Sequence, residues 1–192
     1  EQFDDLCDQM LFNTALPTDF ESSKSSFVLE PGDSDSAVME TSIGQGKTLV
    51  TPFHMALIAS AIANDGVLMK PYVIDRITDA EGEVVEQYEP AEYKTLLSES
   101  DASVLQEYMR YVVEEGTATK LKSDSYEAAG KTGSAEFSSS SDATHSWFVG
   151  YAHNGEEPDI AVAVIVENSG VGSEYAVPIA KQIFDAYYTW EN

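Results

Sequence analysis

The segment AAGKTGSAEF at residues 128–137 places an ammonium group, two hydroxyls and two glycines inside a run that otherwise reads as a β-strand. A strand lysine costs several kcal/mol if its charge is desolvated without a partner, so we expect Lys131 on an edge strand at the rim of a cleft. Gly130 and Gly133 then indicate places where another backbone or a ligand approaches closely. The ammonium beside the Thr132 hydroxyl suits an anionic group such as a carboxylate, and exposed edge amides suit a developing oxyanion.

Lys131 also has a purely structural interpretation, as a charged residue that protects an edge strand from aggregation. The tripeptide Lys-Thr-Gly is expected by chance in roughly one chain of this length in twenty. The tripeptide therefore does not separate the two interpretations, and the surrounding elements have to be considered.

Local patterns predict helices at four places: about 3–10, from Thr51–Pro52 to 64–66, from Ser98 to Gly116, and from Pro178 onward. Two short strands are expected within 72–88, and three longer ones near 126–137, 145–152 and 159–168. The last three imply an antiparallel meander, and the apolar helices before and after it imply cover on both faces. The predicted class is α+β, in three layers.

Residues 13–42 are rich in Ser, Asp and Pro and predict a long irregular connection. Within it, the segment DSDSAVME at 33–40 faintly resembles a calcium loop but lacks the glycine and the terminal glutamate at the required offsets. We interpret it as a solvated loop.

Charge and composition limit the classes of ligand. Ten basic and 34 acidic residues give a net charge of −24, which repels nucleic acid and an anionic membrane surface. The single cysteine, Cys7, permits no internal disulfide and is expected on the buried face of the first helix. His54, His145 and His153 have no metal-ligand spacing with another His or Cys, so they are interpreted as structural, and no metal or cofactor is expected.

The segment AGKTGSAE, followed by HSWFVGY, the apolar run AVAVIVEN and a helix near VPIAKQI, resembles the end of a penicillin-binding protein transpeptidase domain of the class B, monofunctional type. The segment IGQGKTLVTPFHMALIASAIANDG resembles that family's stretch before its central helix. The resemblance spans about residues 40–190 and implies a partial penicillin-binding/serine β-lactamase-like transpeptidase fold.

In this family a serine attacks a D-alanyl-D-alanine stem peptide of peptidoglycan, forms an acyl-enzyme and passes the acyl group to an amine, and β-lactam antibiotics mimic the donor. The resemblance implies that Lys131 is the catalytic lysine of the Lys-Thr-Gly motif. It further implies that Thr132, Gly133 and Ser134 bind substrate, with the Ser134 amide in the oxyanion hole. Ser134 stands where many relatives have threonine, and it keeps the hydroxyl.

The family's other two motifs, Ser-x-x-Lys and Ser-x-Asn, do not occur in the chain. Thr117 and Lys120 have the first spacing, but they follow the expected helix stop at Gly116. We therefore expect residues 1–192 to be the C-terminal part of a single transpeptidase domain, with no nucleophile in this chain and no activity alone. A membrane anchor is expected upstream, which places the whole protein on the extracytoplasmic face of a bacterial membrane.

The same inference predicts that the strand at 159–166 lacks a neighbour, so that the fragment could form a homodimer through that edge. Two other functions use the same cleft: a penicillin-sensing or catalytically silent binding domain, and a class D-like serine β-lactamase. The helix TPFHMALIASAIANDG favours a transpeptidase over both.

Overall fold

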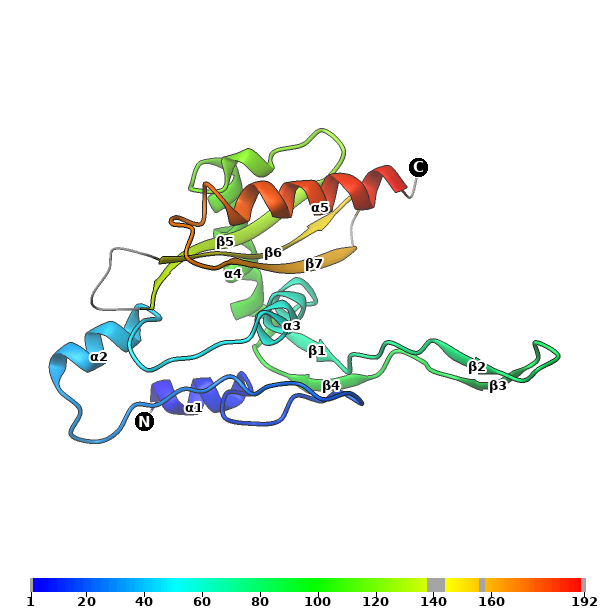
Figure 1. Ribbon diagram of the computed structural model, residues 1–192, viewed down its shortest axis with the longest axis horizontal. Helices are drawn as coiled ribbons and strands as arrows, with labels where there is room; N and C mark the ends of the chain where they lie inside the picture. The colour runs from blue at the N-terminus through cyan, green and yellow to red at the C-terminus, as the bar shows by residue number, and fades with distance from the viewer. Residues whose placement is uncertain (1, 138–143, 156–157, 191–192) are drawn as a thin grey trace.

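A three-stranded antiparallel sheet forms the centre of the computed structural model, which describes residues 2–137, 144–155 and 158–190. Its order is β5-β6-β7, with bounds β5 Glu127–Glu136, β6 Thr144–His153 and β7 Ile160–Val166. Helix α5 (Ala176–Trp190) covers one face, while α3 (Pro52–Ala63) and part of α4 (Glu99–Glu114) cover the other (Figure 1). The predicted α+β class, with helices on both faces of an antiparallel sheet, is confirmed.

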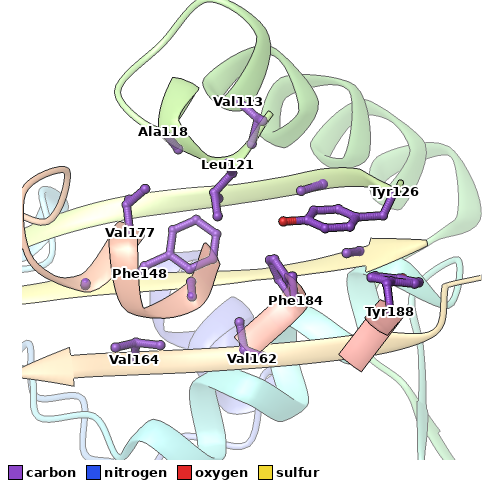
Figure 2. Close-up of a cluster of buried hydrophobic side chains, with 14 residues drawn as sticks. Val113, Ala118, Leu121, Tyr126, Phe148, Val162, Val164, Val177, Phe184 and Tyr188 are labelled. Atoms are coloured by element: carbon purple, nitrogen blue, oxygen red, sulfur yellow. The ribbon is translucent and has the colours of Figure 1, made fainter. Parts of the chain in front are cut away.

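The main core lies between the sheet and α5 (Figure 2). Phe148 of β6 and Phe184 of α5 are both completely buried in it. The Phe148 ring fits because Gly130 and Gly150 lack side chains: a Cβ on Gly130 would lie 2.3 Å from the ring, and one on Gly150 would lie 2.7 Å from it. The close approach expected at Gly130 is therefore made by an aromatic ring.

Helix α3 begins and ends as its sequence predicts. The Thr51 hydroxyl accepts a hydrogen bond from the His54 amide, and Pro52 occupies the first turn. Beyond Ala63 the chain turns through positive φ angles at Asp65 and Gly66, where φ is 50° and 89°. The Gly66 backbone also lies against the Leu97 carbonyl, so both its conformation and its surroundings require glycine.

His54 joins α3 to the segment that follows α1 (Gln2–Gln9). Its side chain is 1% exposed, and Nε2 lies 2.7 Å from the Met10 carbonyl oxygen. A carbonyl oxygen can only accept a hydrogen bond, so Nε2 carries the ring proton and donates it. Nδ1 is buried and has no hydrogen-bond partner among the residues that the structure describes. Burial lowers the pKa of His54, so the imidazole is neutral in the folded protein. The structural interpretation of His54 is supported.

Two smaller sheets surround this centre. The two short strands expected within 72–88 are present as β2 (Arg76–Thr78) and β3 (Val84–Gln87), which pair as a hairpin that projects as an exposed arm (Figure 1). Strand β1 (Val67–Met69) pairs with β4 (Glu92–Thr95), a pairing that the sequence analysis did not anticipate. A short 3-10 helix, η1 (Thr119–Leu121), follows α4.

Two expectations about element bounds were wrong. The segment 33–40 was interpreted as loop, but helix α2 (Asp35–Ser42) forms there, with the Ser34 hydroxyl accepting from the Ala37 amide. Most of its side chains are exposed, so it carries no apolar periodicity that could reveal it. Helix α5 begins at Ala176 and not at Pro178, because the Ala176 amide is bound by the buried Ser146 hydroxyl.

Replacement of Gly130 by alanine tests the packing around Phe148. The added Cβ would overlap the ring and the Val149 carbonyl, so we expect Gly130→Ala to lower the free energy of unfolding by roughly 1–3 kcal/mol. Urea denaturation measures the change. Gly155→Ala is the control, since a Cβ there meets no atom within 4 Å; equal stability of the two variants would contradict the packing argument.

The lowered pKa of His54 makes stability depend on pH. As the pH falls through 6.5, the unfolded chain takes up a proton at His54 before the folded protein does, so the fold loses stability over the range between the two pKa values. The glutamine of the variant His54→Gln does not titrate. We therefore expect the unfolding free energy of wild type to fall relative to that of this variant when the pH is lowered from 8 to 5. The shift is at most about 1.4 kcal/mol per pH unit. Parallel pH curves would refute the assignment.

Candidate functional site

The four residues of the Lys-Thr-Gly-Ser segment lie in the middle of β5, at the edge of the sheet. Among the described residues β5 pairs only with β6, so its other edge is open. In the register the four residues from Lys131 to Ser134 face, in order, Val149, Phe148, Trp147 and Ser146. The expected placement of Lys131 on an edge strand is confirmed. At this position the charge stays in contact with water, which avoids the free-energy cost of burying it.

A cavity of about 460 Å³ adjoins this segment, and we call it the β5 cavity. Its lining includes Lys131, Thr132, Gly133, Ser134 and Ala135 of β5, Trp147 and Val149 of β6, residues 41–45 at the end of α2 and directly after it, and Phe3, Cys7, Phe12, Phe27, Thr48, Val50 and Met55. The β5 part of the lining is therefore polar, and the remainder, which we call its floor, is largely apolar. The Lys-Thr-Gly-Ser segment borders a cleft, as the sequence predicts.

The Lys131 ammonium is exposed at the mouth of this cavity. Nζ donates to the Thr132 carbonyl oxygen at 2.7 Å. Within the described part of the chain Lys131 forms no ion pair, although acidic residues outnumber basic ones by 34 to 10. A cation left unpaired in so acidic a protein is available to an anionic ligand.

The Thr132 and Ser134 hydroxyls of the same segment each have a hydrogen-bond partner from another loop. The Thr132 hydroxyl lies 2.6 Å from that of Thr117, in the loop after α4, and the two share a hydrogen bond. The Ser134 hydroxyl accepts from the Gly172 amide at 3.3 Å. Gln45 donates from Nε2 to the Ser134 carbonyl oxygen at 3.2 Å. The two hydroxyls are thus oriented from outside the strand.

The segment between β7 and α5 crosses closely over β5 at this point. A Cβ on Gly172 would lie 2.6 Å from the Gly133 carbonyl oxygen and 2.5 Å from that of Trp147, so only glycine allows the approach. The backbone approach expected at Gly133 is therefore present, and its partner is Gly172. The fully buried Ser146 donates to the Val171 carbonyl oxygen and holds the crossing segment in place.

The histidines lie apart from these groups. His145 stacks on Phe137 with ring centroids 4.4 Å apart, and it is not part of the β5 cavity lining. His153 lies near the far end of β6 and contacts the Gly155 carbonyl oxygen through Nδ1. No group of three or more His, Cys, Asp or Glu side chains within the described residues could hold a metal ion.

Sequence reasoning missed two contributors to the site. Thr117 was considered only as a possible nucleophile, and its contact with Thr132 becomes visible only in the folded chain. Gly172 lies in an unremarkable loop, and no local signal marked it. Gln45 lines the cavity as well, whereas the neighbouring Gly46 does not.

No helix in the described ranges has the length and apolar character needed to cross a membrane.

Comparison with known proteins gives consistent matches. A family model described as the penicillin binding protein transpeptidase domain matches residues 1–185. The chain is 30% identical to penicillin-binding protein 3 of Bacillus subtilis over 91% of its own length, and 31% identical to the peptidoglycan D,D-transpeptidase PbpA of Mycolicibacterium smegmatis over 73%. It spans only 26% and 30% of the lengths of these two relatives.

Solved structures agree with the sequence matches. Penicillin-binding protein A of M. tuberculosis, as an imipenem acyl-enzyme complex, superposes with a TM-score of 0.82 at 28% identity, covering 95% of this chain and 40% of that one. Penicillin-binding protein 2B of Streptococcus pneumoniae gives a TM-score of 0.78 at 25% identity, covering 96% of this chain and 32% of that one. With a family match over nearly its whole length and a corresponding fold, this chain belongs to the penicillin-binding protein transpeptidase domain family.

Proposed function

We propose that residues 1–192 are the C-terminal part of a peptidoglycan D,D-transpeptidase domain and that the β5 cavity receives the carboxylate end of a D-Ala-D-Ala stem peptide. Lys131 supports proton movement and contributes charge. The Thr132 and Ser134 hydroxyls bind the carboxylate, and Gly133 allows the substrate backbone to approach. The Ser134 amide donates to the developing oxyanion.

The observation that carries this proposal is the unpaired Lys131 ammonium on an open-edged strand whose Thr132 and Ser134 hydroxyls are each held by a hydrogen bond from another loop. A carboxylate accepts charge-assisted hydrogen bonds, which are roughly twice as strong as neutral ones. A lysine that only protects an edge strand from aggregation needs its charge alone. It does not need the Thr117 contact or the Gly172 amide, so the anion site explains more of the geometry.

The nucleophile is proposed to come from polypeptide upstream of residue 1. The chain contains neither Ser-x-x-Lys nor Ser-x-Asn, and the floor of the β5 cavity is apolar, with Phe3, Phe12 and Phe27 in its lining. A helix bearing Ser-x-x-Lys would cover this floor with its apolar face and present its serine to Lys131. Positions i and i+3 lie one turn apart, so the helix lysine could take the serine proton.

The partners follow from the same assignment. Some solved relatives are acyl-enzyme complexes of imipenem and of penicillin G, so we infer that the complete protein binds peptidoglycan stem peptides and β-lactam antibiotics. We place it on the extracytoplasmic face of the bacterial cell membrane, held by an upstream anchor, where the cell wall is assembled.

Labelling with a fluorescent penicillin tests the proposed division of the active site. We expect no covalent label on the 192-residue chain and stable label on a version extended upstream through Ser-x-x-Lys, because only that version carries the attacking oxygen. Gel fluorescence after denaturation measures the label. Covalent labelling of the 192 residues alone would overturn the placement of the nucleophile, and rapid loss of label from the extended protein would favour a β-lactamase.

In the extended protein, Lys131→Ala should slow labelling by roughly 10²–10⁴-fold, the usual contribution of a group that assists proton transfer. Lys122→Ala removes another exposed lysine, outside the β5 cavity, and should leave the rate unchanged. Equal rates in the two variants would exclude Lys131 from the chemistry.

The open edge of β7 predicts self-association of the isolated fragment. In the described structure β7 pairs only with β6, and its seven residues are all apolar. We propose that a second copy pairs along this edge when no upstream strand is present. Analytical ultracentrifugation of the 192-residue chain should show a fraction of dimer that rises with protein concentration. A sedimentation profile that stays monomeric at high concentration would disprove the pairing.

A further inference from the structure

Thr117 lies outside the β5 cavity but contacts a residue that lines it. Its hydroxyl oxygen is 2.6 Å from that of Thr132, whereas Thr117 itself is not part of the cavity lining. Thr132 is a proposed ligand of the substrate carboxylate. Any role of Thr117 in that function is therefore exerted through Thr132.

A bound carboxylate fixes the direction of the hydrogen bond between the two threonines. A hydroxyl has one proton to donate, and a carboxylate can only accept. When Thr132 donates its proton to the carboxylate, the contact with Thr117 persists only with Thr117 as the donor and Thr132 as the acceptor. A hydroxyl that accepts one hydrogen bond is also a stronger donor, because hydrogen bonds in a chain polarise one another.

The backbone on both sides of Thr117 is anchored to the rest of the fold. The Ala118 amide donates to the Val112 carbonyl oxygen of α4 at 3.0 Å, and Ala118 is completely buried in the main core. On the other side, a Cβ on Gly116 would lie 2.8 Å from the Val112 Cα, so the return of the chain against α4 requires glycine. Thr117 is thus held on a fixed stretch of backbone, although its own side chain is exposed.

The same loop is tied to the segment that holds the Ser134 hydroxyl. Lys120 Nζ donates to the Ser173 carbonyl oxygen at 3.2 Å and pairs with Glu174 at 3.0 Å. Gly172, which precedes Ser173, donates its amide to the Ser134 hydroxyl. The two loops that hold the two hydroxyls are therefore joined to each other.

We propose that Thr117 is a positioning residue for the transpeptidase reaction. Its hydroxyl donates to Thr132 Oγ1 and leaves the Thr132 proton for the terminal carboxylate of the donor peptide. This role rests on the proposed function, which puts that carboxylate against Thr132. An exposed threonine with only a structural role would affect all donors alike or none, because water can satisfy its hydroxyl equally well.

Two acyl donors that differ only in the charge at one end test this role in the extended protein. One is an N-acyl-D-alanine thioester of thioglycolate with a free carboxylate, and the other carries an amide in place of that carboxylate. The kcat/KM for thiol release measures acylation. We expect Thr117→Val to lower kcat/KM for the carboxylate donor roughly 3–10-fold, the usual contribution of one neutral hydrogen bond. The value for the amide donor should change less than about twofold, because an amide can itself donate to Thr132.

Two further variants separate the hydrogen bond from a general disturbance of the loop. Thr117→Ser keeps the hydroxyl and should hold kcat/KM for the carboxylate donor within about twofold of wild type. The matched control is Thr119→Val, which removes another exposed threonine hydroxyl two residues further along, in η1, and should leave both rates unchanged. Circular dichroism verifies that each variant is folded.

The two donors also distinguish failure of this role from failure of the proposed function. If wild type uses both donors equally well, the carboxylate site is wrong and the role of Thr117 is lost with it. If wild type prefers the carboxylate donor and Thr117→Val keeps that preference in full, only the role of Thr117 is overturned. Equal losses for both donors, or no rescue by serine, would overturn it as well.

Discussion

An ammonium group on a β-strand must either reach a partner or remain in contact with water, and this constraint shapes one end of the molecule. Lys131 satisfies it by lying on the open-edged strand β5, where its Nζ contacts a backbone carbonyl and faces a cavity. The same open edge leaves backbone amides available to a ligand. The position that keeps the Lys131 charge in contact with water therefore also leaves it accessible to an anion.

Close packing of small residues fixes the surroundings of that charge. Gly130 and Gly150 admit the Phe148 ring, which anchors β5 and β6 to the core under α5. Gly172 lies against the Gly133 backbone and brings an amide to the Ser134 hydroxyl. These approaches are between rigid groups, so a side chain of any size in place of one of these glycines would displace β5 and the Thr132 and Ser134 hydroxyls with it.

Two cavities adjoin β5, and most of the charged residues that line them differ in sign. Lys131, Thr132 and Ser134 line the β5 cavity, whereas Asp65, Glu107 and Glu127 line a separate cavity near Tyr151. The net charge of −24 would by itself make every surface attractive to cations. An anion site in such a protein depends on local arrangement, namely an unpaired lysine with hydrogen-bond donors beside it.

Sequence alone determined the features that depend on neighbouring residues: the start of α3 at Thr51 and Pro52, the cap of α4 at Ser98, and the two short strands of the β2–β3 hairpin. Caps, turns and apolar periods act over a few residues, and so they can be read from one stretch of chain. Tertiary structure alone decided the β1–β4 pairing, the exposed helix α2, the contact of Thr117 with Thr132 and the crossing of Gly172 over Gly133. Except for α2, whose exposed side chains leave no apolar pattern, these features join residues far apart in the sequence, and their energies come from packing that exists only once the sheet and its helices have assembled.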